Sequence, residues 1–264
     1  MIAKSRIAGV EVSHATPLSA RDAIIEAALS RRHFAVTALA VHGVMAGTNS
    51  PTIAYVINRL DLVVADGQPV RWALNWLHGA ELTERVYGPK LMLDVCEKAA
   101  ELGLGVFLLA PSLQSRDILV ASLPARFPGL IIAGTQIVQF RKGTPAEVIA
   151  LTSQVRDSGA SILMVGMGCP KQEIFAYEMR GQLNIPIVSV GAAFDFHAGL
   201  AKEPPFWMQR VGLQWFHRLL QDPRRLAKRY LVLNSQYVLA ILRQRWFGPP
   251  ALREAPSLEP AHLI

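Results

Sequence analysis

Several short segments of the sequence place chemically useful side chains directly after apolar runs. The first is Asp66, which follows the apolar run 62–65 and precedes Gly67. Open parallel sheets present their ligands at the carboxyl ends of their strands, which makes this carboxylate the first candidate for a site residue. The alternative is that Asp66 and Gly67 form a turn in which Asp66 caps a helix beginning near Pro69.

Residues 166–173, with the sequence GMGCPKQE, form the second candidate segment. Glycines such as Gly168 let a backbone approach a ligand closely, and a helix that begins after the proline offers unpaired N–H groups to a phosphate or sugar oxygen. The spacing matches neither a dinucleotide fingerprint nor a P-loop. Lys171, Gln172 and Glu173 are candidates for ligand contacts, and for Lys171 and Glu173 the alternative is an exposed first helical turn.

Residues 190–199, with the sequence VGAAFDFHAG, form a third segment, which ends the last apolar run. Gly191 in this segment allows close approach of a ligand, and Asp195 and His197 can face it. A single histidine between an aromatic residue and alanine is more often structural, and Asp195 can equally hold the loop.

Arg85 is the fourth candidate, and it precedes a Tyr-Gly-Pro triplet that opens a helix at residue 89. A guanidinium in this place can contact a phosphate through several N–H groups at once. The alternative is an arginine that lies in solvent at the surface. The sequence leaves both interpretations open.

Short apolar runs alternate with longer stretches of helical periodicity, which predicts an α/β fold with a mainly parallel sheet flanked by helices. The predicted strands span residues 33–39, 62–65, 105–109, 130–133, 161–165 and 187–190. Predicted helices begin near residues 17, 51, 89, 112 and 145. Thr16 or Ser19 is expected to cap the first of them, and Thr144 with Glu147 begins the last.

The positive charge of the chain is concentrated near its C-terminus. Eight basic residues and one acidic residue lie between Pro204 and Trp246, a balance of +7 that equals the formal charge of the whole chain. We therefore expect an α/β domain over residues 1–200, a basic, aromatic, helical appendage over 201–247 and a disordered tail over 248–264. Such an appendage suits an anionic membrane surface, and the alternative is a helical pair packed wholly on the sheet.

Composition narrows the class of protein further. The only cysteines, Cys96 and Cys169, form no CxxC pair or Cys/His cluster, so neither a disulfide framework nor a metal site is expected, and a reducing cytoplasm is favoured. We expect no secretory signal and no membrane-spanning segment, because no apolar run is long enough. A mean hydropathy of +0.27 and a pI near 9.7 together point to a peripheral position on a membrane surface.

Taken in order, these segments resemble the WecG/TagA/CpsF family of glycosyltransferases over residues 17–240. The resemblance rests on VT at residues 36–37, ADG at 65–67, Gly88, FPG at 127–129, PKQE at 170–173, GAAFD at 191–195 and the basic and aromatic residues from 215 to 230. The resemblance implies a Rossmann-like fold. This is the same α/β class that the alternation of apolar runs and helical stretches predicts.

The resemblance implies transfer of a sugar, without a metal or other cofactor and with inversion, from a nucleotide sugar often of the N-acetylmannosamine type. The implied acceptor is a saccharide linked to undecaprenyl diphosphate, in the synthesis of exopolysaccharide or another bacterial surface polysaccharide. Carried over residue by residue, the general base falls on Asp66, a second catalytic residue on Thr37 and a substrate-binding glutamine on Gln172.

In this family the C-terminal appendage is thought to meet the inner face of the cytoplasmic membrane and to help complete the active site. Without a bound metal, arginines and helix N-termini must compensate the charge of the diphosphate. The residues expected to contact membrane or diphosphate are Arg218, Arg224, Arg225 and Arg229. Relatives can also assemble as homo-oligomers.

Three positions depart from the family pattern. Leu39 stands where asparagine is usual, Glu203 where arginine is usual and Gln214 where glutamate is usual. We expect from these changes an altered donor specificity, with GDP-mannose or another neutral hexose nucleotide in place of an N-acetylated sugar. The alternative is a relative that has lost activity.

Two other classes of protein fit the sequence less well than a glycosyltransferase. A nucleotide-binding oxidoreductase would need a glycine-rich fingerprint after the first strand, and His42-Gly43 with Gly47 lacks that spacing. A non-catalytic adaptor on a membrane or nucleic acid is supported only by the C-terminal charge. The chain has no motif of a known nucleic-acid reader, so no nucleic-acid partner is expected.

Overall fold

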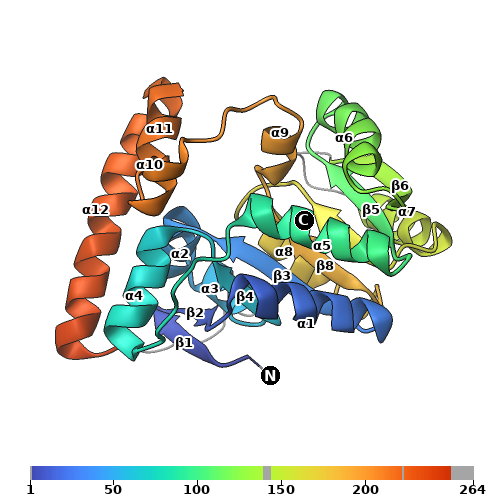
Figure 1. Ribbon diagram of the computed structural model, residues 1–264. Coiled ribbons are helices and arrows are strands. Elements are labelled where there is room, and N and C mark those ends of the chain that lie inside the picture. The colour runs from blue at the N-terminus through green and yellow to red at the C-terminus, as the bar shows by residue number, and fades with distance from the viewer. Residues whose placement is uncertain (1, 139–143, 222, 251–264) are drawn as a thin grey trace.

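The structure, a computed structural model, describes residues 2–138, 144–221 and 223–250. Its centre is a six-stranded sheet in the order β4-β3-β8-β7-β5-β6, in which all neighbouring strands are parallel (Figure 1). The strands are β3 (Phe34–Leu39), β4 (Leu62–Ala65), β5 (Gly105–Ala110), β6 (Ile131–Ile137), β7 (Ile162–Val165) and β8 (Pro186–Ser189). The predicted fold class is confirmed.

Strand β6 continues beyond its predicted end at residue 133. Within the described residues, β6 lies at the edge of the sheet and pairs with β5 alone, and its residues are partly or fully exposed, so polar side chains are tolerated. Thr135 and Gln136 continue the strand although they interrupt the apolar run from which its length was predicted.

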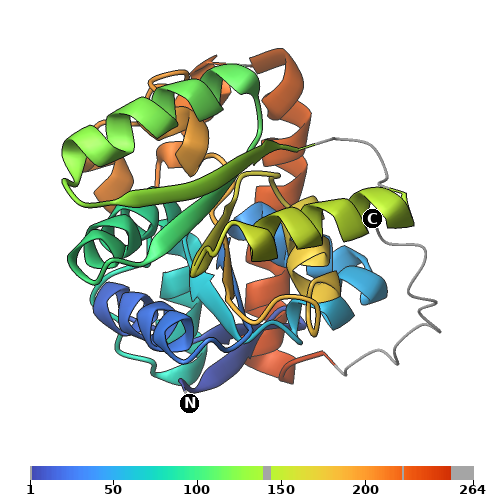
Figure 2. The same ribbon diagram turned by 90° about the vertical axis from the view of Figure 1, so that its right-hand side faces the viewer.

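Helices cover both faces of the sheet (Figure 2). The cores on the two faces take alternate strand residues, with Leu62 and Val64 in one and Val63 and Ala65 in the other. The first face is covered by α1 (Pro17–Leu29), α5 (Gly88–Glu101), α6 (Leu113–Arg126) and α9 (Ala193–His197). The second is covered by α2 (Val41–Asn49), α3 (Pro51–Ile57), α4 (Gln68–His78), α7 (Pro145–Asp157) and α8 (Lys171–Glu178).

Local sequence signals determine where two of these helices begin. Thr16 caps α1: its hydroxyl accepts the Ser19 N–H at 3.2 Å, and Ser19 Oγ accepts the Thr16 N–H at 2.9 Å. Thr144 and Glu147 form the same reciprocal pair at the start of α7. The predicted starts at residues 17 and 145 are therefore confirmed, together with their cause.

A short hairpin of β1 (Lys4–Ile7) and β2 (Val10–Ser13) precedes the sheet, and no pattern in the sequence predicts it. Its turn, Ala8-Gly9, has positive φ angles of 50° and 93°. Ile7, Val10 and Val12 of the hairpin are buried in the same core as α2 and α4.

In the part of the chain that the structure describes, three helices follow residue 205, namely α10 (Phe206–Arg210), α11 (Gln214–Gln221) and α12 (Pro223–Phe247). Helix α12 runs alongside α2 and α4 (Figure 1). Tyr237 and Ile241 join the core of that face, and the buried Tyr237 hydroxyl donates to the Pro69 carbonyl at 3.0 Å. Among the residues described, no helix is long and apolar enough to cross a membrane.

A second buried anchor of α12 is Gln244, whose amide bridges the turn of the hairpin. Its Oε1 accepts the Ala8 N–H at 2.7 Å and its Nε2 donates to the Arg6 carbonyl at 2.6 Å, with the side chain 5% exposed. Removing the amide takes away the acceptor of the buried Ala8 N–H, while the Arg6 carbonyl retains its bond to His78 Nε2 at 2.8 Å. We expect Gln244→Ala to lower the free energy of unfolding by about 2 kcal/mol, measured by urea denaturation.

The control for this prediction is Gln236→Ala on the same helix. Gln236 meets Asn49 only at 3.5 Å and at an exposed position, so its loss is expected to change stability by less than about 0.5 kcal/mol. Equal stabilities of the two variants would contradict the anchoring role of Gln244.

Candidate active site

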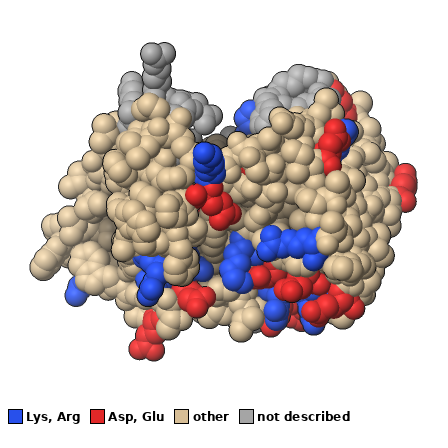
Figure 3. Space-filling view, turned by 45° about the horizontal axis from the view of Figure 1, so that its top comes forward, with Lys and Arg blue, Asp and Glu red and all other residues tan. Residues whose placement is uncertain are grey.

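A cavity of about 890 Å³ opens at the carboxyl ends of β3, β4, β7 and β8, between the sheet and α12. Figure 3 shows a hollow between the side of the molecule formed by α10–α12 and the side formed by the helices over the sheet. Strand β4 lies on one side of β3 and all later strands lie on the other, so the loops diverge at this point. Open α/β sheets bind their ligands at such a switch point. The volume suits a ligand of nucleotide-sugar size.

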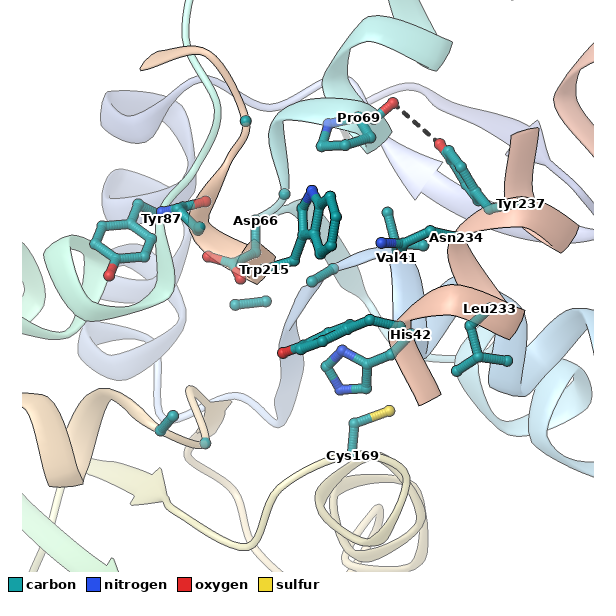
Figure 4. Close-up of a pocket in the computed structure, with 18 of the residues that line it drawn as sticks. Val41, His42, Asp66, Pro69, Tyr87, Cys169, Trp215, Leu233, Asn234 and Tyr237 are labelled. Carbon is teal, nitrogen blue, oxygen red and sulfur yellow. Dashed lines mark hydrogen bonds between the residues drawn. The ribbon is translucent and has the colours of Figure 1, made fainter. Parts of the chain in front are cut away.

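Asp66 lines this cavity directly after β4 (Figure 4). Its Oδ1 accepts the Gly88 N–H at 2.7 Å, and its own N–H donates to the Leu39 carbonyl at 3.1 Å. The N-cap residue of α4 is Gly67, and no side chain bonds to the start of this helix. Asp66 therefore does not serve as the helix cap. The two backbone bonds hold the carboxylate in the cavity wall.

Gln172 and two glycines form another part of the wall. Gln172 is 3% exposed, and its Oε1 accepts the Gly168 N–H at 3.1 Å. Gly191 has a φ of +54°, and a Cβ added there would lie 3.2 Å from Gln172 Oε1. The loops after β7 and β8 therefore pack closely because residue 191 has no side chain. Three of the residues predicted to bind substrate thus line the same cavity as Asp66.

Thr37 lies behind this wall and does not line the cavity. Its buried hydroxyl donates to Glu173 Oε1 at 2.6 Å, and Gln172 Nε2 donates to the same oxygen at 3.1 Å. Glu173 is fully buried, and burial raises the pKa of its carboxyl, while the hydrogen bonds from Thr37 and Gln172 act in the opposite direction. The three side chains form a buried polar network that orients the Gln172 amide.

The buried Glu173 carboxyl gives a prediction for the pH dependence of stability. Its folded pKa is raised, so above the unfolded value of about 4.3 the folded state retains a proton that the unfolded chain releases, and stability is lost as pH rises. Urea unfolding between about pH 5 and 8 is expected to show the wild type losing stability relative to Glu173→Gln. The surface variant Glu97→Gln serves as the control, and parallel pH profiles of wild type and Glu173→Gln would contradict the prediction.

Arg85 joins the end of β4 to the C-terminal helices. Its Nη1 donates to the Asp66 carbonyl at 2.8 Å and to Gln214 Oε1 at 2.5 Å, and its Nη2 donates to Gln209 Oε1 at 3.1 Å. The guanidinium also lies over the Tyr87 ring at 4.1 Å, and the residue is 8% exposed. Burial lowers the pKa of Arg85, and the Asp66 carboxylate opposes that shift. Arg85 therefore does not line the cavity, and its guanidinium hydrogen-bonds to groups of the protein behind the cavity wall.

The other predicted residues lie farther from the cavity. Lys171 is exposed at the start of α8, and Asp195 in α9 does not contribute to the lining. His197 bonds through Nε2 to the Pro89 carbonyl at 2.8 Å, and burial lowers its pKa, which agrees with the structural interpretation. The side chains of the four predicted arginines lie outside the described part of the structure, although their backbone belongs to α11 and α12; they are Arg218, Arg224, Arg225 and Arg229.

Several lining residues were not identified from the sequence as site residues. His42 follows β3 and faces the cavity, as do Trp215 of α11 and Asn234 of α12 (Figure 4). Of these, His42 could have been identified from the sequence, because it follows closely after the end of a predicted strand. Leu39, where the family usually has asparagine, is fully buried and paired with Ala65, so it does not line the cavity.

Within the described ranges, no group of three or more His, Cys, Asp and Glu side chains could hold a metal ion. The parallel sheet with its cavity at the switch point defines an α/β, Rossmann-like protein with a site for an extended ligand. The family model of the glycosyl transferase WecG/TagA/CpsF family matches residues 5–250, nearly the whole chain. The chain belongs to this family and is a glycosyltransferase, with a nucleotide-sugar donor and an acceptor as its substrates.

Proposed function

We propose that the protein transfers a sugar from a nucleotide sugar to a saccharide linked to undecaprenyl diphosphate, in the synthesis of a bacterial surface polysaccharide such as an exopolysaccharide. The observation that carries the proposal is the position of Asp66 in the wall of the cavity, where the Gly88 N–H holds its carboxylate. The cavity is large enough for the sugar of the donor and the attacking hydroxyl of the acceptor to meet there. Family membership supplies the type of reaction.

In the proposed mechanism Asp66 accepts the proton of the acceptor hydroxyl as that oxygen attacks the anomeric carbon. The bond from the anomeric carbon to the nucleotide diphosphate breaks on the opposite face, so the configuration inverts and the diphosphate leaves with the bonding electrons. In this proposal Gln172, Gly168 and Gly191 contact the donor. The support is that all three line the cavity and that Gln172 is held by the network of Thr37 and Glu173.

Charge compensation in this mechanism does not require a metal. The leaving diphosphate is stabilised by arginines of the C-terminal helices and by backbone N–H groups at the loop ends. The arginines proposed for this role are Arg218, Arg224, Arg225 and Arg229.

The proposed location is the inner face of the cytoplasmic membrane, with the protein bound peripherally through its C-terminal helices. Large apolar side chains of these helices are exposed, with Phe206 at 73%, Trp207 at 61%, Trp246 at 78% and Phe247 at 83%. Aromatic residues beside clustered arginines suit the headgroup region of an anionic bilayer.

The proposed donor is a neutral hexose nucleotide such as GDP-mannose. The support is the change of two polar positions: Gln214 pairs with Arg85 where the family usually has glutamate, and Glu203 stands where arginine is usual. Both changes alter the charge beside the cavity.

A donor screen tests both the reaction and the donor. Purified protein is incubated with membranes that contain the native acceptor and with labelled nucleotide sugars, and label is followed into the lipid fraction. We expect transfer from a hexose nucleotide. Turnover of UDP-N-acetylmannosamine or its uronic acid alone would overturn the donor, and the absence of transfer from every donor would overturn the function.

A further inference from the structure

The cavity extends away from Asp66 along two facing helices, and this extension is the apolar arm. Six residues of α4 and α12 line it: Trp72, Ala73, Trp76, Val238, Ile241 and Leu242. On each helix these residues recur at spacings of three and four, so each helix presents one face to the arm. Since a helix rises about 1.5 Å per residue, the α4 side of the cavity from Pro69 to Trp76 extends over about 10 Å.

The side chains of the apolar arm offer almost no hydrogen-bonding groups. Their only polar atoms are the indole N–H groups of Trp72 and Trp76. The neighbouring Tyr237 hydroxyl already donates to the Pro69 carbonyl at 3.0 Å. A nucleobase or a sugar placed here would lose hydrogen bonds to water without replacement, whereas a hydrocarbon would lose none. The chemistry of the arm therefore selects a hydrocarbon ligand.

The apolar arm is a groove with a buried floor and exposed sides. Ala73 and Ile241 form the floor at 3% and 6% exposure, while the Trp76 and Leu242 side chains are 53% and 41% exposed. Beyond Leu242, the exposed Trp246 lies one helical turn further along α12. A hydrocarbon chain can thus pass from the apolar surface of the molecule into the cavity.

The wall at Trp72 is fixed by an adjacent glycine. Gly212, in the turn between α10 and α11, has a φ of +75°, and a Cβ added to it would lie 2.8 Å from Trp72 Cη2. The indole therefore packs directly on the backbone of this turn and connects α4 to the C-terminal helices. Gly212 and Trp72 both line the cavity, and the close contact fixes the position of the indole in its wall.

We propose that the apolar arm binds the isoprenoid chain of the acceptor, in the units next to its diphosphate. The inference rests on the proposed lipid-linked acceptor and adds the subsite that recognises its lipid part. With the chain in the arm, the diphosphate and the acceptor sugar lie toward Asp66, whose carboxylate lines the same cavity.

Kinetics with two acceptors test the subsite. Both carry the same sugar diphosphate, one on a polyprenyl chain and one on a short alkyl group, and both are assayed in detergent. The double variant Trp76→Gln/Leu242→Gln is expected to raise the KM of the polyprenyl acceptor about tenfold, with no change in the KM of the nucleotide sugar or of the short-chain acceptor. The control is Val120→Gln on α6, whose 39% exposure matches that of Leu242.

Two results would overturn the subsite: an unchanged KM for the polyprenyl acceptor, or an equal rise of the KM for both acceptors.

A second measurement, on the wild-type protein, depends neither on turnover nor on the folding of the variants. A prenyl diphosphate with a diazirine in its first isoprene units is photolysed with the protein, and the labelled peptides are identified by mass spectrometry. Labelling of 72–76 and 238–242 is expected, and labelling elsewhere would overturn the proposal.

These measurements separate the subsite from the proposed function. Transfer to the short-chain acceptor by the wild type and the double variant alike demonstrates the glycosyltransferase reaction whatever happens at the arm. If neither acceptor receives a sugar while the diazirine probe labels α4 and α12, the proposed reaction fails and the lipid subsite stands.

Discussion

Replacing Asp66 by asparagine is expected to lower the rate of sugar transfer by about two to four orders of magnitude, the usual contribution of a general base. The asparagine side chain keeps an oxygen that can accept the Gly88 N–H, so the wall of the cavity is preserved. It cannot accept the proton of the acceptor hydroxyl. The binding of the nucleotide sugar, measured by calorimetry, should therefore stay close to that of the wild type.

The matched control for this prediction is Asp94→Asn. Asp94 lies on α5 and forms a surface ion pair with Lys90 at 2.6 Å, away from the cavity lining. Its variant should retain the wild-type rate. A wild-type rate in Asp66→Asn itself would leave the family assignment intact and remove Asp66 from the mechanism.

Replacing Arg85 by methionine is expected to lower the rate about tenfold to hundredfold, because small displacements of reacting groups have effects of that size. Arg85 links the Asp66 carbonyl to Gln209 of α10 and to Gln214 of α11, and Gln214 lines the cavity. Methionine fills the same space without donating these bonds. Arg85→Lys should recover part of the rate, since one ammonium cannot reproduce the fork of the guanidinium.

Two readouts separate this positioning role from a general loss of structure. The kcat of Arg85→Met should fall while circular dichroism and the binding of the nucleotide sugar are retained. Arg116→Met, which removes an exposed pair with Asp117, should match the wild type in every assay. A full rate in Arg85→Met would contradict the role given to these hydrogen bonds.

Most of the sheet was predictable because its strands are buried on both faces and read as apolar runs. Residues 62–65 and 162–165 are fully buried along their whole length, and the prediction found both. The hairpin at residues 4–13 was missed because its strands, KSRI and VEVS, are not continuous apolar runs and its Ala-Gly turn lacks the Asn-Gly or Asp-Gly signal. Its stability comes from long-range contacts such as that of Gln244 with Ala8.

The candidate site was predictable to the extent that strand ends define it. Asp66, Gly168 and Gly191 follow three different strands, and a parallel sheet brings their carboxyl ends to one edge. The contact of Thr37 with Glu173 joins residues 136 positions apart, and no local pattern encodes it. The apolar arm was missed for the same reason, because its two helices meet only in the folded chain.

The most direct test of the proposed reaction is the formation of glycosylated lipid by purified wild-type protein and Asp66→Asn, with a defined undecaprenyl-diphosphate-linked acceptor and a labelled nucleotide sugar. We expect labelled lipid with the wild type, and a loss of that product with Asp66→Asn while both proteins unfold at the same urea concentration. Equal product from the two proteins would contradict the role of Asp66, and no product from the folded wild type with any donor would contradict the proposed function.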